Sequence, residues 1–164
     1  MKTTLASCAA LLALTACATP QQYSAADDIH AWLIAVRDND RATFNAHVDR
    51  DALARQIEGR LLAELPREGI GRGLGILIAA PVAEAATGLL AQPRVFRAYA
   101  VYNGYDPAKP IPRKVVIAQY LKNAGDGRVC IGDADDPCTL VFSRQGDIWK
   151  LTAFQGDLKD LRGS

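Results

Sequence analysis

The chain has 164 residues, of which 19 are basic and 18 acidic, so its formal net charge is +1. This balance gives no general attraction to nucleic acid or to anionic lipid headgroups, and no nucleic-acid partner is expected. The length fits a single domain that can bury a core of its own.

The N-terminal segment has the layout of a secretory signal peptide. Met1 and Lys2 form a basic tip, and a mostly apolar stretch runs from Leu5 to Leu14. This stretch is about half of the ~20 apolar residues that span a bilayer as a helix, so a transmembrane anchor is not expected here. Cleavage by an ordinary signal peptidase near Ala16 or Ala18 is one way to process it.

The tetrapeptide Leu14-Thr15-Ala16-Cys17 resembles the lipobox of bacterial lipoprotein precursors, in which a leucine and two small residues precede the lipid-bearing cysteine. The resemblance implies that residues 1–16 are a signal peptide and that a diacylglycerol thioether anchors Cys17 to a membrane. Two or more acyl chains make such an anchor stable. By the sorting rule of enteric bacteria, Ala18 after the cysteine implies the periplasmic face of the outer membrane, with the inner membrane as the alternative.

Two cysteines remain once Cys8 is removed with the signal peptide and Cys17 carries the lipid. Cys130 and Cys138 form an even pair in an oxidising compartment, which predicts a disulfide. A zinc site is the rival interpretation, and it would need two further ligands. The chain's two histidines lie far away in the sequence without ligand spacing, so no metal and no cofactor is expected.

The mature chain is expected to begin with a polar tether over residues 17–24, followed by one domain over 25–158 and a tail over 159–164. A helix is predicted to start at Ser24, with Asp27 in a capping position. Its apolar face recurs at i, i+3, i+4 and i+7. The residues of that face are Ile29, Trp32, Leu33 and Val36.

Two more helices are predicted after the break at Asp38-Asn39-Asp40. Asp40 can cap a short helix that contains Phe44, and Asp49 can cap a third helix that runs to Leu65. Apolar residues recur every four positions in the third helix and predict its buried stripe. They are Leu53, Ile57, Leu61 and Leu65.

No catalytic residue is assigned from the sequence. His47 is the nearest candidate for acid–base chemistry, because Asp49 and Asp51 are close to it, but no third group in view would orient it. His30 is expected to be a half-exposed polar residue on the flank of the first helix. Three serines remain in the mature chain: Ser24, Ser143 and Ser164. None lies in a Gly-x-Ser-x-Gly elbow, so a hydrolase is disfavoured.

Four glycines alternate through an expected loop: Gly69, Gly71, Gly73 and Gly75. The loop matches a phosphate-binding loop only weakly, because no strand precedes it and no Gly-Lys-Ser/Thr follows. It leads into an apolar run from Leu74 to Ala83, which is too short to span a bilayer and is interrupted by Pro81 and Glu84. A buried helix is predicted, with insertion into the surface of a nearby bilayer as the alternative.

Pro93 is expected in the first turn of another helix, which Asn103-Gly104 should end. One side of this helix collects Val95, Phe96, Tyr99 and Tyr102. The following segment, Tyr105 to Pro112, contains three prolines and is expected to be irregular.

The C-terminal third is rich in β-branched and aromatic residues and predicts four strands. They are Lys114–Leu121, Arg128–Ile131, Cys138–Ser143 and Ile148–Phe154. Consecutive strands with short links pair antiparallel. The predicted fold class is therefore α+β, with N-terminal helices packed on one face of a roughly four-stranded antiparallel meander.

Two details of this sheet are predicted as well. Trp149, Leu151 and Ala153 should share a face of the last strand, with Trp149 in the core. The loop between the cysteines carries Asp133, Asp135 and Asp136, but it lacks the glycine and the distal glutamate of a calcium loop. No calcium site is therefore expected.

Asp38–Val48 and Thr139–Phe154 resemble segments of an uncharacterised family of bacterial envelope lipoproteins. In that family a helix and an A-R-D-x-D turn open the domain. A strand like Leu140-Val141-Phe142 follows later, and a Trp-Lys/Arg-Leu-Thr strand, here Trp149-Lys150-Leu151-Thr152, comes after the next turn. The opening helix pair also resembles the start of the NTF2-like folds, many of which bind small ligands.

Two functions are consistent with these features. The leading one is a non-enzymatic outer-membrane lipoprotein, an accessory or binding module whose partners are the membrane, through Cys17, and an envelope protein or lipid. The alternative is a small-ligand or lipid-binding pocket of NTF2-like type, with weak acid–base chemistry at His47. A deep pocket that holds a buried His or Asp would favour an enzyme.

Overall fold

The computed structural model describes residues 18–156, except for 65–68, 70 and 133–137. Several predicted features lie outside the described residues: the signal peptide and lipobox with Cys17, Leu65, the three loop aspartates and the tail. The helices of the described part are α1 (Pro20–Asp38), α2 (Arg41–Ala46), α3 (Arg50–Glu64), α4 (Arg72–Leu90), α5 (Pro93–Tyr102) and α6 (Lys114–Tyr120). The strands are β1 (Lys122–Asn123), β2 (Arg128–Ile131), β3 (Leu140–Gln145) and β4 (Ile148–Phe154).

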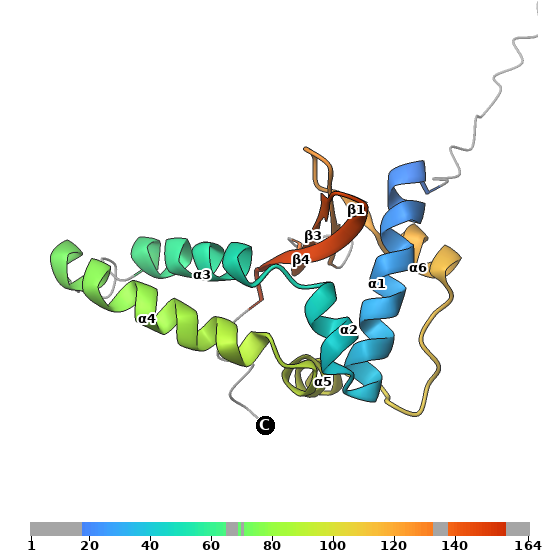
Figure 1. The fold of residues 1–164 in the computed structure, drawn as a ribbon, viewed down its shortest axis with the longest axis horizontal. Helices are drawn as coiled ribbons and strands as arrows, with labels where there is room; N and C mark the ends of the chain where they lie inside the picture. The colour runs from blue at the N-terminus through green and yellow to red at the C-terminus, as the bar shows by residue number, and fades with distance from the viewer. Residues whose placement is uncertain (1–17, 65–68, 70, 133–137, 157–164) are drawn as a thin grey trace, which may run out of the picture.

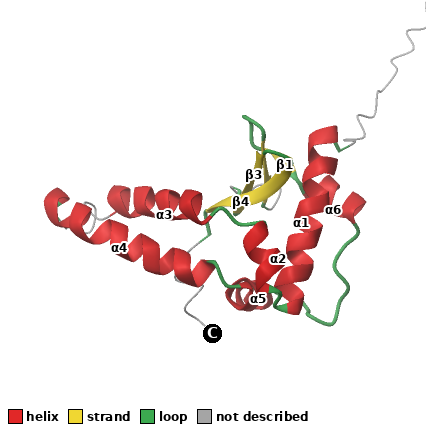
Figure 2. Ribbon diagram, in the orientation of Figure 1, coloured by secondary structure: helices red, strands yellow, loops and turns green. Residues whose placement is uncertain are grey.

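The helices precede a C-terminal sheet, which confirms the α+β fold class (Figure 2). The sheet order is β1-β2-β3-β4, and every neighbouring pair is antiparallel, as in a meander. Figure 1 shows two regions: α1, α2, α5 and α6 gather beside the sheet, while α3 and α4 lie side by side and project away as a helical hairpin. We call the first region the body and the second the hairpin.

The core of the body is a cluster of aromatic rings from both helices and strands. Trp32 of α1 lies 5.3 Å from Phe96 of α5 and 5.5 Å from Phe142 of β3, measured between ring centroids, and meets both rings edge-to-face. Phe142 pairs in register with Val129 of β2 and Leu151 of β4, so the three side chains share the sheet face that meets the helices. The first helix and the meander therefore close one core.

Trp149 is a core residue, as predicted, with only 2% of its surface exposed. Its backbone N–H donates to Asp28 of α1 at 2.9 Å, and its indole N–H donates to Ser24 at 3.2 Å. Leu151 is fully buried as well, whereas Ala153 is only half-buried. The last strand is thus fixed to the first helix by hydrogen bonds as well as by packing.

The predicted tether is wrong from residue 20 onward, because α1 begins at Pro20 rather than at Ser24. Thr19 and Gln22 form a capping box: the Thr19 hydroxyl accepts from the Gln22 N–H, and the Gln22 side chain accepts from the Thr19 N–H. Pro20 occupies the first helical position, where its missing N–H costs nothing. These polar residues suggested a linker, but their order is that of a helix start.

The first predicted strand is also wrong, because Lys114–Tyr120 is the helix α6 and only Lys122–Asn123 is extended. The β-branched composition indicated a strand, but such propensity depends strongly on packing. As a helix, this segment buries Ile117 and Ala118 against α1 and holds Lys114 at 2.5 Å from Asp27. Ile117 and Ala118 are adjacent in the chain, so α6 contacts α1 through a narrow part of its surface.

The predicted starts of α2, α3 and α5 are confirmed. The Asp40 carboxylate accepts from the N–H groups of Ala42 and Thr43, and Asp49 accepts from the N–H of Ala52 at 2.9 Å. α5 starts at Pro93 and ends before Asn103, as expected. Each of these signals is local and needs no knowledge of the tertiary structure.

The glycine-rich segment and the apolar run depart from their predictions. Helix α4 starts at Arg72, so Gly73 and Gly75 are helical rather than part of a loop. The helix continues to Leu90, and over its described length it is long and apolar enough to cross a membrane. It is not a buried helix, because only 28% of the stretch Gly73–Leu90 is buried.

Candidate functional site

A pocket of about 440 Å³ lies in the body between α1, α5, α6 and the segment that joins α5 to α6. In Figure 1 this segment runs around the outside of α1 from the end of α5 to the start of α6. The wall of the pocket is mainly apolar. Its principal apolar residues are Leu33, Val36, Ala100, Ile111, Ile117 and Ile131. Pockets of this size, with apolar walls and few polar groups, are typical of small-molecule sites.

The outer wall is irregular, as predicted, but it is held in place by local hydrogen bonds. The N–H of Tyr105 donates to the carbonyl of Ala100 at 2.9 Å. The Asp106 carboxylate accepts from the N–H of Ala108 at 2.9 Å, and its carbonyl accepts from Lys109 at 3.0 Å. Prolines follow in this wall and fix the backbone φ angle. The pocket therefore has a defined shape without regular secondary structure around its rim.

Cationic side chains outnumber acidic ones in the lining, with Arg37, Arg97 and Lys109 against Asp106. Arg37 is already neutralised, because its guanidinium binds the Asp38 carboxylate at 2.7 and 2.9 Å. This pairing raises the pKa of Arg37 and lowers the pKa of Asp38.

Arg97 and Lys109 are the cations still available to a ligand. The Arg97 guanidinium donates to the backbone carbonyl of Arg37 at 3.2 Å. Within the described residues, neither Arg97 nor Lys109 forms an ion pair with a carboxylate. A ligand with a negative group could therefore be bound at this end of the pocket.

Tyr105 contributes a second polar feature to the lining. Its hydroxyl is shielded from solvent and has no hydrogen-bond partner among the described residues. Leaving such a group unpaired costs about 1–3 kcal/mol. An acceptor on a ligand could satisfy it, so the pocket combines an apolar wall with one unpaired donor and two cations.

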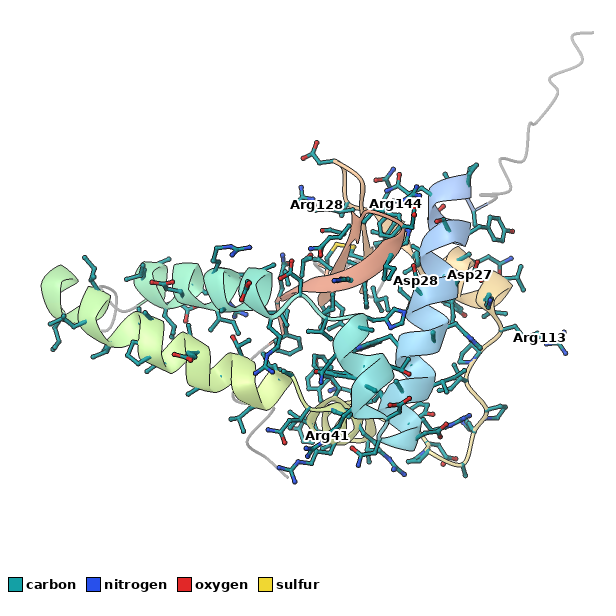
Figure 3. All side chains as sticks on the ribbon, in the orientation of Figure 1. Asp27, Asp28, Arg41, Arg113, Arg128 and Arg144 are labelled. Carbon is teal, nitrogen blue, oxygen red and sulfur yellow. A yellow bond between two sulfur atoms is a disulfide. The ribbon has the colours of Figure 1, made fainter. Side chains whose placement is uncertain are left out.

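His47 lies outside this pocket and has a different neighbour from the one expected. Its Nε2 is 3.5 Å from an oxygen of Asp28 on α1, and its Nδ1 is 2.8 Å from the Thr43 carbonyl. The group that orients His47 is therefore Asp28. Asp28 lies 19 residues earlier in the chain, on another helix, so no local sequence pattern connects it with His47. Figure 3 shows adjacent Asp27 and Asp28 on α1, and they interact with opposite neighbours, Lys114 of α6 and Trp149 of β4.

The contacts of His47 and Asp28 join α1 and α2 to the sheet. One Asp28 oxygen accepts from the backbone of β4 and the other faces the imidazole, so both are engaged within the protein. The backbone of His47 also accepts from the N–H of Leu151 at 2.9 Å, which adds a short parallel bridge to the sheet. No nucleophilic side chain among the described residues forms a hydrogen bond with His47.

Asp49, the expected partner of His47, is directed elsewhere. Its carboxylate caps α3 and also accepts from the Gln145 side chain. Burial raises the pKa of Asp49, but the hydrogen bonds from Ala52 and Gln145, together with the positive charges of Arg55 and Lys150, more than offset it and lower the pKa below its ordinary value. Asp51 is exposed, and His30 is half-buried on α1.

Cys130 and Cys138 form a disulfide, with their Cα atoms 5.4 Å apart. Cys130 is fully buried in β2 and pairs in register with Val141 of β3. Cys138 lies before β3, which starts at Leu140, so the predicted start of that strand is two residues early. The bond therefore closes the loop at the end of the β2–β3 pair rather than crossing the ladder itself.

The remaining described residues offer no metal centre. No group of three or more His, Cys, Asp or Glu side chains comes together in the part of the chain that the structure describes. A second hollow of about 360 Å³ lies between Ser24, Arg144 and Trp149, but the Ser24 hydroxyl already accepts from the Trp149 indole there.

No protein-family model, curated protein or solved structure matches this chain. The resemblance to envelope lipoproteins and to NTF2-like folds therefore stays a prediction from the sequence.

Proposed function

We propose that the chain is a lipid-anchored protein of the bacterial envelope that works as a binding module, and that the apolar pocket is its ligand site. The lipobox resemblance at Cys17 supports the anchor and a location on the periplasmic face of the outer membrane. The observation that carries the binding function is the pocket of about 440 Å³ between α1, α5 and α6.

The ligand that fits this pocket is a small amphipathic anion, such as a fatty acid. Its apolar body would contact Leu33, Val36 and Ile117, and its negative group would bind Arg97 and Lys109. Hydrogen bonds to charged groups contribute about 1.5–3 kcal/mol each, so two cations give such a ligand an advantage over a neutral one of equal size.

The composition of the lining favours binding over catalysis. Among the described residues, the lining contains no histidine, cysteine or serine. His47 and Asp28 are engaged with each other and with the sheet, outside the pocket. A ligand in the pocket would therefore meet side chains that hold it in place, without a histidine, cysteine or serine beside it.

A fluorescent fatty acid titrated into the purified full chain tests this proposal. Arg97→Gln and Lys109→Gln should each weaken binding by about ten-fold, because each removes a charge-assisted contact. Ala100→Trp should abolish binding, because it fills the pocket from its wall. Arg41→Gln is the matched control, because Arg41 is an exposed arginine of α2 outside the lining (Figure 3).

Binding that is unchanged in Ala100→Trp, in a variant that melts like the parent, would overturn the assignment of the pocket. The anchor is tested separately: Cys17→Ala should move the protein from the membrane fraction to the soluble fraction of cells. Unchanged fractionation of that variant would contradict lipidation at Cys17.

A further inference from the structure

An exposed apolar surface lies on the outer side of α4. Among its large exposed side chains, Leu74, Leu77 and Leu89 have 57%, 74% and 58% of their surface exposed. We propose that α4 lies in the surface of a phospholipid bilayer, with its outer face in the boundary between headgroups and acyl chains. We define this face by Leu74, Leu77, Val82 and Leu89, which fall within an arc of about 140° on a helix with 3.6 residues per turn.

The first argument is the direction of the side chains. Five described residues of α4 are buried, and four of them are small and recur every four positions: Gly75, Ala79, Ala83 and Thr87. The fifth is Leu90, at the end of the helix. A helix on a water-soluble protein turns its large apolar residues to the core and its polar residues to solvent. In α4 the small residues face α3 and large apolar residues face outward, which suits an apolar surrounding on the outer side.

The second argument is charge. From Gly73 to Leu90, Glu84 is the only charged residue, and the mean hydropathy of this stretch is 1.7. Glu84 lies about 80° around the helix from Leu74 and about 140° from Leu89, at the edge of the outer face. A carboxylate in that position reaches the headgroups while the face itself meets acyl chains.

The third argument is the two-sided character of the hairpin. Its other helix, α3, exposes Asp51 and Arg55 and buries Leu53 and Ile57. In Figure 1 the hairpin projects from the body, and among the described elements the main neighbours of α4 are α3 and α5. The unit thus has one polar side and one apolar side, which is the arrangement of elements that lie in the plane of a membrane surface.

Lying on the bilayer is favoured over crossing it. With 19 residues, α4 is about 28 Å long, close to the ~30 Å thickness of the hydrocarbon core. Crossing, however, would pull α4 away from α3, expose Leu53 and Ile57 to water, and carry Glu84 into the hydrocarbon. Lying on the surface keeps every contact between the two helices.

A lipid surface also fits the outline of the face better than a second copy of the chain does. Pro81 and Gly88 both lie within the outer face, between Leu77 and Leu74 around the helix, so the surface has no regular ridge for a partner helix to pack against. Fluid acyl chains adapt to such a surface. Glycine and proline are also more frequent in membrane helices than in water-soluble ones, where they weaken a helix.

Depth-dependent fluorescence tests this placement. Leu74→Trp and Leu89→Trp put a reporter on the outer face of α4, and Leu62→Trp is the matched control on the exposed side of α3. The full chain is mixed with vesicles of phosphatidylethanolamine and phosphatidylglycerol that contain brominated acyl chains. The two α4 reporters should be quenched, while the α3 reporter should match the parent, whose Trp32 and Trp149 are buried.

Equal quenching of all three reporters, or of none, would overturn the proposal. A blue shift that appears without vesicles and grows with protein concentration would instead show that a second copy covers the face. The proposal does not rest on the pocket or on Cys17, because all three reporters share the same N-terminal attachment.

As a second measurement, Leu74→Glu with Leu89→Glu should weaken vesicle binding by ten-fold or more, on the order of one buried leucine side chain. Unchanged vesicle binding of this pair would contradict the insertion of the face.

Discussion

In the body, the large aromatic side chains point inward, whereas in the hairpin the large apolar side chains of α4 point outward. Trp32, Phe96 and Phe142 are 3% exposed or less, while Leu77 is 74% exposed. Both regions contain apolar segments, and for both the composition predicted a buried segment. The difference shows that composition alone does not decide whether an apolar segment is buried. The direction of its side chains decides this, together with the size of those that face the neighbouring helix.

The two regions meet where the base of the hairpin joins the sheet. Arg60 of α3 donates to the carbonyls of Phe154 and Gly156 at 3.1 and 3.2 Å, and the Gln56 side chain accepts from the N–H of Phe154 at 3.3 Å. Ala83 and Leu90 of α4 belong to the same core as the aromatic cluster. Stability should therefore fall from the body, through this base, to the tip of the hairpin.

The largest expected difference between the regions is in the effect of truncating an apolar residue. Trp149→Ala should lower the free energy of unfolding by ~3–5 kcal/mol, because it leaves a cavity in the core of the body. Leu77→Ala on α4 should change it by less than about 0.5 kcal/mol, because that side chain is exposed. Denaturant unfolding followed by circular dichroism measures both.

The contrast fails if the two variants lose similar stability. In that case the outer side of α4 would be covered in solution, and the distinction between the body and the hairpin would not hold.

The disulfide gives the next largest effect, and it should act on the body alone. Cys130 and Cys138 are eight positions apart, and a loop of this size stabilises a domain by about 2.6 kcal/mol in the chain-entropy model. Reduction should lower the melting temperature and raise amide exchange in β2 and β3, with little change at the tip of the hairpin. Two free thiols in the native, unreduced protein would contradict the bond.

Much of the local structure could be predicted from the sequence, because it depends on neighbouring residues. The caps at Asp40 and Asp49 and the helix start at Pro93 are such signals. α6 was missed because its helical state depends on packing Ile117 and Ala118 against α1, which lies almost 90 residues earlier. The outward direction of α4 was missed because its periodicity is carried by small residues, Gly75 and Ala79 among them, which a search for large apolar residues ignores.

A ligand pocket was the alternative expected from the sequence, but its lining residues and the true neighbour of His47 were not identified, for a related reason. Leu33 and Val36 were recognised as apolar residues of α1, but both were assigned to the core. They line the pocket instead of filling the core completely, and no local pattern distinguishes these two uses. Likewise, Asp28 meets His47 only through the packing of α1 against α2 and β4. Contacts between distant segments need the fold before they can be found.

The smallest effect concerns Asp49, which caps the first turn of α3 at the base of the hairpin. Replacement by Ala should cost about 1 kcal/mol at neutral pH, because it removes the cap. Asp49→Asn is the matched variant, because asparagine caps about as well as aspartate but carries no charge. The difference between the parent and Asp49→Asn therefore reports the contribution of the charge alone.

The pH dependence of that difference follows from the lowered pKa of Asp49, whose ordinary value is 3.8. Because folding lowers this pKa, the carboxylate stabilises the folded state at every pH above the ordinary value. That contribution is lost as the pH falls below about 4 and through the lowered pKa of the folded state. The unfolding free energies of the parent and of Asp49→Asn should therefore converge as the pH falls from about 5 through the lowered pKa of the folded state. A difference that stays constant as the pH falls would mean that the Asp49 charge does not stabilise the base of the hairpin, and that Asp49 acts there through its capping geometry alone.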